Sequence, residues 1–303
     1  MTVLAAILAQ VIHSALMLAA APVAGALRDG FEARLGGRRG ADPWQPWRDL
    51  RRLARKQPAL TETATLLPRI APVACFAAAA LAAAMVPSFT LGMAFARFAD
   101  LLVVVGLLAA SRIVVALAGL EAGTTPAGLA AGRMTRLACL SEPTLYLVIL
   151  AFGMLGGTTN LDLLFGLRLQ GMLQPVAAAI LAVAALALAA LAGPDEAALT
   201  AEFSGADLAL VRMGGCLREL AWLSLAAGLL LPAGVAEPGR GPLAWVIGLA
   251  AWSAKVVVLI ACLAALRAGA GDLRPSRRPL ALGVAAILGT LAALLVLASV
   301  AAA

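Results

Sequence analysis

Charged residues are scarce in this chain of 303 residues. Asp, Glu, Lys and Arg make up 13% of it, against about 25% in a typical soluble protein. Hydrophobic residues reach 63%, where about 45–50% is usual. A soluble domain of this length could not bury so much apolar surface, because much of any folded surface must face water. Intrinsic disorder requires low hydrophobicity and is also excluded. The composition therefore indicates an integral membrane protein.

Residues that carry chemistry are equally few. The chain has one histidine, His13, and four cysteines scattered singly along it, Cys75, Cys139, Cys216 and Cys262. It has no C-x-x-C pair, so we expect it to bind no metal ion and no iron–sulfur cluster. It also has no G-x-x-x-x-G-K-S/T loop for nucleotide phosphates. We therefore predict no catalytic residue and no redox centre in this chain itself.

Long apolar stretches dominate what remains. About 20 predominantly apolar residues form a helix that crosses the bilayer core. Each such stretch here is rich in Ala and Leu, and none shows the alternating pattern of a β-barrel strand. The sequence thus predicts an all-α integral membrane protein, a single membrane domain over residues 1–303. The predicted spans are 3–27, 70–87, 98–120, 137–157, 173–193, 213–234, 243–266 and 279–302.

The distribution of basic residues predicts the orientation of these eight helices. With the N-terminus outside, eighteen of the 23 Lys and Arg residues fall in inner loops, and only Arg97, Arg168 and Arg240 fall in outer loops. Cytoplasmic loops of membrane proteins carry such an excess. We therefore expect a multi-pass protein of the cell inner membrane with both termini in the periplasm. The net charge of +7 is explained by these loops and anionic lipid, and no nucleic-acid partner is expected.

The first inner loop, residues 28–69, contains an amphipathic segment at 43–57. Trp44, Trp47, Leu50 and Leu53 recur at helical spacing, and arginines fill the other face. This pattern predicts a surface helix. It is typical of an interfacial anchor with tryptophans at headgroup depth, and equally of a docking surface for a soluble partner.

Ionisable residues inside the spans are costly, at roughly 2.5–3.5 kcal/mol each. Asp100, Arg112, Glu142 and Lys255 lie at such positions. Structural ion pairs and snorkelling side chains are one explanation. A proton route is the other, because buried groups whose protonation is perturbed are typical of functional sites, and we favour it for Glu142 and Lys255. The energy for proton movement would have to come from partner subunits.

Five motifs follow one another along the chain: EARLGGRRGADPWQPWRDLRRLARK at 32–56, LPRIAPVACF at 67–76, SRIVVALAGLEAGTTPAGLAAGRMTRLACLSEP at 111–143, AEFSG at 201–205, and Lys255 followed by RPSRRP at 274–279. Together they resemble the membrane anchor subunit of group 4 membrane-bound nickel–iron hydrogenases, of the formate hydrogenlyase and hydrogenase-4 type. That subunit is homologous to the H subunit of respiratory complex I. The resemblance covers nearly the whole chain.

The resemblance implies an anchor that docks a soluble redox arm and couples electron transfer to ion translocation. Its implied partners are membrane lipid, the soluble hydrogenase large and small (iron–sulfur) subunits and antiporter-like membrane subunits. The nickel–iron site and iron–sulfur clusters would lie in those partners. The resemblance assigns the proton relay to Glu121, Glu142, Glu202, Lys255 and Arg112. Asp100 is added to the relay because it lies inside a predicted span. Docking of the soluble arm is assigned to Gly37, Arg38, Arg39, Gly40, Gln45, Pro46 and Arg133.

Three departures from the family pattern reduce the number of acids. Met134 follows Arg133 where the family has Glu, the loop at 193–205 is several residues shorter, and Arg267 stands near the position of another family Glu. These changes imply a thinner proton relay, and so a chain that either couples weakly or acts mainly as an anchor.

Two alternative functions remain open. The first is an H-type subunit of a quinone-reducing NADH dehydrogenase, complex I, in which a quinone would bind. The second, less favoured, is an independent secondary transporter. Transporters often contain two corresponding halves with broken helices, and this sequence has no convincing internal repeat.

Overall fold

The computed structural model describes residues 3–40, 42–59, 65–171, 197–231, 233–270 and 278–301. Nearly all of these residues are helical, and within these ranges β-structure is limited to two isolated bridges. Seven helices are long and apolar enough to cross a membrane. They are α1 (Val3–Leu35), α3 (Leu66–Met85), α4 (Leu101–Glu121), α5 (Thr125–Gly156), α9 (Gly205–Leu230), α10 (Pro242–Ala270) and α11 (Arg278–Ala301). The predicted all-α membrane fold is confirmed, and the predicted span at 173–193 lies outside the described residues.

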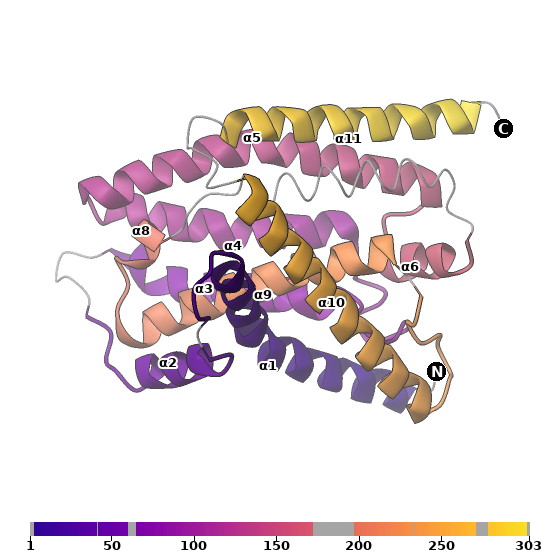
Figure 1. The fold of residues 1–303 in the computed structure, drawn as a ribbon, viewed down its shortest axis with the longest axis horizontal. Helices are drawn as coiled ribbons and strands as arrows, with labels where there is room; N and C mark the ends of the chain where they lie inside the picture. The colour runs from indigo at the N-terminus through magenta and orange to yellow at the C-terminus, as the bar shows by residue number, and fades with distance from the viewer. Residues whose placement is uncertain are drawn as a thin grey trace.

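Three short helices complete the described fold: α2 (Gln45–Ala54), α6 (Leu161–Leu169) and α8 (Ala197–Thr200). The surface helix predicted at 43–57 is present as α2. The long helices run roughly along one axis, and α10 crosses α1 obliquely (Figure 1). The two termini lie at the same end of the bundle as α6, which we call the α6 end. We call the opposite end, with α2, α8 and the α4–α5 turn, the α2 end.

Three helices extend beyond the apolar stretches that predict them. Helix α1 continues to Leu35 instead of 27, α5 begins at Thr125 instead of 137, and α9 begins at Gly205 instead of 213. The predicted inner loop at 28–69 is therefore helical in its first eight residues. Apolar length measures only the part of a helix inside the bilayer, and polar residues can continue the helix outside it. All three extensions lie at the α2 end (Figure 1).

Small residues bring the central helices close together. Helix α3 packs between α4 and α9, and its buried face is largely alanine, including Ala79, Ala82 and Ala83. A Cβ added to Gly214 in α9 would lie 3.0 Å from Sγ of Cys75 in α3. Such small residues allow helix backbones in membranes to approach closely and gain van der Waals contact. Helix α3 is thereby held at the centre of the bundle.

Candidate functional site

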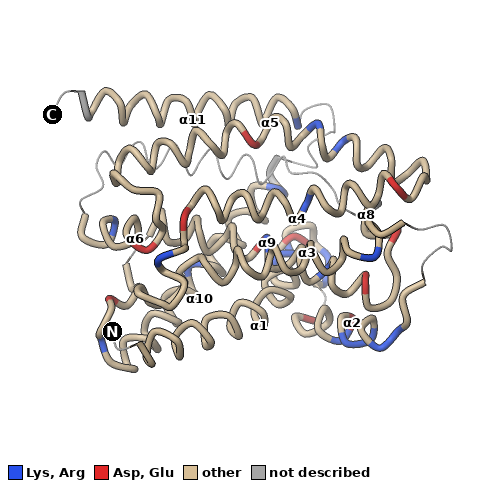
Figure 2. The backbone as a smooth tube through the Cα atoms, turned by 180° about the vertical axis from the view of Figure 1, so that it is seen from behind, with Lys and Arg blue, Asp and Glu red and all other residues tan. Residues whose placement is uncertain are grey.

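Lys and Arg residues cluster at the α2 end of the bundle (Figure 2), where α1 ends in a tight glycine turn. The N–H of Gly37 donates to the carbonyl of Arg34 at 3.0 Å, and the N–H of Arg38 donates to the carbonyl of Ala33 at 2.7 Å. These two bonds form a Schellman motif, and Gly37 takes the left-handed conformation that the motif requires, with φ 69°. The turn presents the exposed side chains of Arg38 and Arg39.

The segment after this turn folds back onto α1. A Cβ added to Gly40 would lie 2.9 Å from Cα of Gly30, a separation that only glycine tolerates here. The loop Gly36–Gly40 therefore rests directly on the last turns of α1. Its glycines are explained by backbone approach.

Helix α2 turns its apolar side toward the protein. The indole N–H of Trp47 donates to the carbonyl of Ala19 in α1 at 3.1 Å, and Leu53 is buried. Pro46 occupies the first turn of α2, where a missing N–H costs nothing, and the side-chain oxygen of Gln45 accepts from Arg48 at 3.0 Å. The opposite side of α2 is exposed. It carries Arg51 and Arg52, and the residues directly after α2, Arg55 and Lys56, are exposed as well.

The segment Ala201–Gly205, here called the AEFSG motif, joins α2 to the rest of the bundle. The hydroxyl of Ser204 accepts from the N–H of Ala59 at 2.7 Å, and the carbonyl of Lys56 accepts from the N–H of Ala206 at 3.2 Å. A Cβ on Gly205, which has φ +54°, would lie 2.5 Å from the carbonyl oxygen of Gln57. The motif thus fixes the end of α2 against the start of α9.

Two of the predicted relay acids flank the α4–α5 turn. Glu121, the last residue of α4, accepts from the hydroxyl of Thr65 and from its N–H at 3.0 Å. Glu202 in the AEFSG motif accepts from the hydroxyl of Thr124 at 2.6 Å. Thr124 is the N-cap of α5 and follows Glu121 by three residues. Glu121 and Glu202, predicted as relay acids, therefore lie on two sides of one turn at the α2 end.

Glu142 and Lys255 lie on helices whose main packing partners differ. Glu142 is half-buried in α5, which continues as a helix through Pro143. Helix α5 packs chiefly against α11 and α4, whereas α10, which carries Lys255, packs against α1 and α9. Within the part of the chain that the structure describes, neither side chain has a hydrogen bond or ion pair. The structure does not bring these two predicted relay residues together.

Asp100 and Arg112 also stand apart from the pair of acids at the α2 end. Asp100 caps the N-terminus of α4, accepting from the N–H of Leu102 at 2.8 Å and from the hydroxyl of Thr159. It lies at the α6 end, about 30 Å along α4 from Glu121. Arg112 is half-buried and lies about 14 Å from Glu121 along the same helix.

The neighbouring residues Arg133 and Met134 of α5 differ in their exposure to solvent. Arg133, a predicted docking residue, is exposed, whereas Met134 is 3% exposed. Met134 lies in an apolar cluster with Leu199 and Phe203 of the neighbouring segments. A methionine is suited to this dry position because its flexible chain fills gaps. Where the family pattern has an acid, Met134 thus contributes an apolar side chain to the packing.

Two ion pairs at the α2 end are absent from the sequence predictions. Arg28 Nη1 lies 2.5 Å from Glu219 Oε2, and Arg267 Nη1 lies 3.0 Å from Glu32 Oε1. The sequence places Arg28 and Arg267 in inner loops, but their acidic partners are 191 and 235 residues away. No local spacing signals a contact across such a separation.

Neutral hydrogen bonds make one of the helix contacts at the α6 end. His13 is fully buried, and its Nε2–H donates to the carbonyl of Ala83 at 3.0 Å while Nδ1 accepts from the hydroxyl of Ser88 at 2.7 Å. Gln10 donates to the carbonyl of Ala84 at 2.9 Å. These bonds join α1 to the end of α3. His13, to which the sequence gives no role, is a structural residue of this contact.

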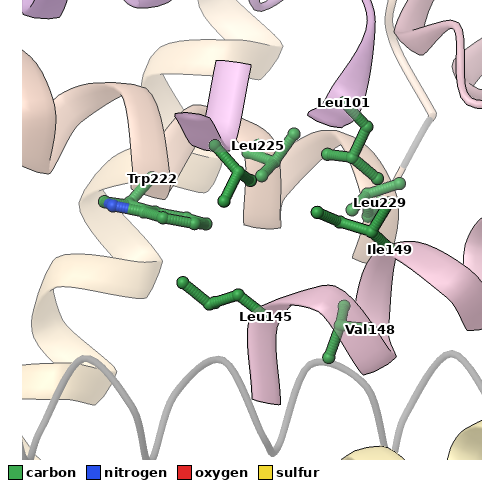
Figure 3. A pocket seen from close by; sticks show the side chains of 8 residues that line it. Leu101, Leu145, Val148, Ile149, Trp222, Leu225 and Leu229 are labelled. Atoms are coloured by element: carbon green, nitrogen blue, oxygen red, sulfur yellow. The ribbon is translucent and has the colours of Figure 1, made fainter. Parts of the chain in front are cut away.

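An apolar pocket lies between α4, α5 and α9 (Figure 3). Trp222 contributes the only side chain in its lining that has a polar atom. The pocket thus offers a dry surface, and no predicted relay residue lines it. Its lining consists of Leu101, Val105, Leu145, Val148, Ile149, Trp222, Leu225 and Leu229.

The pattern of the NADH dehydrogenase family matches residues 3–299. The chain belongs to this family. Among proteins of known function, it is 29% identical over 239 residues to "Hydrogenase-4 component C" of Escherichia coli (strain K12), covering 74% of this chain and 75% of that protein. It is 25% identical over 244 residues to "Formate hydrogenlyase subunit 4" of the same organism, covering 76% and 80%.

Among solved structures, this member of the NADH dehydrogenase family matches a chain of the membrane-bound sulfane sulfur reductase, an archaeal respiratory membrane complex. The TM-score is 0.79 with 18% identity, and the match covers 95% of this chain and 98% of the other. At this identity the likeness concerns the fold alone. The resemblance on which the sequence analysis relies is confirmed by the family and by its two curated relatives. The chain is a multi-pass membrane protein whose relatives are components of multi-subunit complexes.

Proposed function

We propose that the chain is the membrane-anchoring and proton-coupling subunit of a multi-subunit membrane-bound oxidoreductase of the hydrogenase or formate hydrogenlyase type. The observation that carries this proposal is the surface at the α2 end. It is formed by the loop Gly36–Gly40, helix α2 and the AEFSG motif, and we call it the docking platform. In this proposal the soluble hydrogenase large and small subunits bind there and contain the nickel–iron site and the iron–sulfur clusters. Antiporter-like subunits adjoin the chain within the membrane.

The packing of α2 favours docking over lipid anchoring. An interfacial anchor needs its apolar face for the lipid, but Trp47 and Leu53 of α2 face the protein, and of the two tryptophans only Trp44, at the N-cap, is largely exposed, at 62%. The exposed face carries the cations. Such a face complements an acidic protein surface, which it would steer and orient. Bonds from the AEFSG motif fix the platform in advance, so little conformational freedom would be lost on binding.

The acids Glu121 and Glu202 support the coupling part of the proposal. Glu202 belongs to the docking platform and Glu121 lies next to it, within hydrogen-bond distance of Thr124 and Thr65 respectively. A proton released or taken up beneath the soluble arm would meet them first. Glu142 lies about 27 Å further along α5, and its place in the relay comes from the family resemblance. The docking platform would face the cytoplasm, with both termini in the periplasm.

Charge reversal on α2 tests the docking. The full chain, tagged and purified with its complex in mild detergent, is expected to retain nickel–iron and ferredoxin-like subunits. The double variant Arg51→Glu/Arg55→Glu should lose them, because both side chains are exposed on the docking platform. Arg240→Glu is the matched control, since Arg240 is equally exposed but lies at the α6 end. Equal retention in all three proteins would refute the docking platform.

Neutralising Glu142 tests the coupling. Glu142→Gln should abolish coupled proton movement in vesicles while the soluble hydrogenase activity persists, because an amide cannot carry a proton by this route. Proton uptake is measured with a pH-sensitive dye while the complex turns over. Proton movement that survives the change would remove Glu142 from the relay.

The family name favours one second candidate, the H-type subunit of a quinone-reducing NADH dehydrogenase. In that case the apolar pocket of Figure 3 would form part of a quinone channel. Co-purification of NADH-oxidising subunits and a quinone with the tagged chain would favour this candidate. A chain that purifies alone would contradict both proposals and favour a secondary transporter.

A further inference from the structure

The last two turns of α1 are tied to two other helices by ion pairs. Arg28 Nη1 and Glu219 Oε2, 2.5 Å apart, connect α1 to α9. Arg267 Nη1 and Glu32 Oε1, 3.0 Å apart, connect α10 to α1. The two ion pairs start from residues one turn apart on α1 and connect it to two different helices, α9 and α10. Together they restrain both the position and the rotation of this end of α1.

On average these pairs are more shielded from water than the pairs Arg48–Asp42, Arg52–Asp49 and Arg240–Glu237. Arg28 also pairs with Asp29 of its own helix, at 2.9 Å. The side chains of Arg28 and Glu219 are 25% and 28% exposed, and those of Arg267 and Glu32 are 36% and 34% exposed. In the pair Arg240–Glu237 at the α6 end the values are 65% and 47%. Exposed pairs contribute little because water and salt compete for both charges. The partly shielded pairs are therefore the better candidates for a geometric restraint.

The docking platform begins where this restraint acts. Helix α1 ends at Leu35, three residues after Glu32. The loop that follows then folds back, so that Gly40 lies against Gly30. Gly30 is between Arg28 and Glu32 in the sequence. Any rotation of this turn of α1 would carry the loop Gly36–Gly40 with it.

We propose that Arg28–Glu219 and Arg267–Glu32 form an ionic brace that positions the docking platform for its soluble partner. This inference depends on the proposed function, since it assumes that the platform binds such a partner. The four residues are positioning residues and do not themselves touch the partner. They hold the end of α1 so that Arg38 and Arg39 are presented in a fixed orientation.

The first experiment uses the tagged full chain in its complex, washed at increasing salt. Glu32→Gln and Arg267→Gln are each expected to retain about threefold less soluble partner than the wild type at the same salt, a fold-change typical of losing one coupled pair. The charge-swapped double variant Glu32→Arg/Arg267→Glu should restore retention, because it recreates the pair with reversed polarity. Glu237→Gln, the same change in the exposed pair at the α6 end, should retain the partner as the wild type does. Failure of the swap to restore retention would overturn the brace.

The second experiment measures the restraint without the partner. Spin labels are placed at the exposed positions Arg39 and Leu266, each changed to Cys in a full chain whose native cysteines are alanine. Glu32→Gln should broaden the distance distribution between the labels, and the charge-swapped variant should narrow it again. An unchanged distribution in Glu32→Gln would refute the brace. If the wild-type chain retained no soluble partner at all, the proposed function would fail, while this measurement would still decide whether the brace exists.

Discussion

The two ends of the bundle are built from different interactions. At the α6 end, the carboxylates of Asp100 and Asp162 bind loop residues, but uncharged groups make the contact between α1 and the end of α3, where His13 bonds to Ser88 and Ala83. The backbone of Leu91 also bonds to that of Ala236 at 3.0 Å. At the α2 end, charged groups connect α1 to its neighbours, in the pairs Arg28–Glu219 and Arg267–Glu32. Both ends lie where helices finish and backbone groups lose their helical partners. Helix α1 is thus held by neutral hydrogen bonds at the α6 end and by ion pairs at the α2 end.

The difference follows from what each end presents. Buried neutral hydrogen bonds are weakened only if water reaches them. The α6 end is therefore suited to staying packed and dry. Ion pairs leave charge at the surface and respond to the charge of a neighbour. The exposed arginines of α2 add positive charge to this surface. The α2 end is therefore the end that a charged protein can recognise.

The largest expected effect breaks the α2 end at its closest backbone contact. Gly205→Ala should destabilise the chain by about 2–3 kcal/mol, because Gly205 has a positive φ and its new Cβ would lie 2.5 Å from the carbonyl oxygen of Gln57. Thermal stability of the purified full chain in detergent measures the loss. Gly128→Ala is the matched control, since a Cβ there meets nothing within 4 Å and its helix would gain propensity. Equal stability of the two variants would mean that the AEFSG motif does not fix α2.

An effect of comparable size on stability, but without loss of the soluble partner, is expected at the α6 end. His13→Leu leaves the hydroxyl of Ser88 and the carbonyl of Ala83 without their partner in a dry site. Unsatisfied buried groups of this kind cost about 1–3 kcal/mol, so the thermal unfolding temperature should fall by a few degrees. Retention of soluble partners should stay as in the wild type, because the change lies far from the docking platform. Loss of retention without loss of stability would contradict the separation of the two ends.

The sequence was sufficient to predict the fold class and the seven long helices of the described residues, because apolar length reports directly on the bilayer. It also predicted α2, but it did not predict the short helices α6 and α8. The relay role of Glu121 and Glu202 stays a prediction that depends on the family resemblance. The interhelical pairs of Arg28 and Arg267 could not be predicted, since their partners are far away in the chain. Neither could the ends of α1, α5 and α9, where polar residues continue the helix beyond the apolar stretch.

The functional meaning of glycines was only partly predictable. The sequence assigns Gly37 and Gly40 to docking by resemblance. The structure adds the physical reason, a Schellman turn at Gly37 and close backbone approach of Gly40 to Gly30. Asp100, which the sequence places in the relay, caps α4. Capping and backbone approach depend on exact geometry, which periodicity and charge counts do not contain.

The smallest effect compares one aspartate from each end, Asp162 and Asp42. Asp162 of α6 accepts from the N–H of Gly92 at 2.9 Å, but its burial dominates and raises the pKa of its carboxyl. The pKa of Asp42 before α2 is lowered by the N–H of Trp44 and by the side chain of Arg48. An acid with a raised folded-state pKa binds protons more tightly when folded, so its contribution to stability falls as the pH rises above the ordinary carboxyl value. An acid with a lowered pKa contributes above that value, and this contribution is lost as the pH falls.

The two aspartates should therefore give the unfolding temperature opposite dependences on pH. Asp162→Asn should gain stability relative to the wild type as the pH rises from about 4 toward 7, since the amide removes a charge whose burial is unfavourable. Asp42→Asn should show the reverse trend and a smaller one, because Asp42 is exposed and water screens its interactions. Thermal unfolding of the three full-length proteins at several pH values measures both trends. Parallel curves for the wild type and Asp162→Asn would show that burial at the α6 end does not control this carboxyl, and would remove the electrostatic contrast between the two ends.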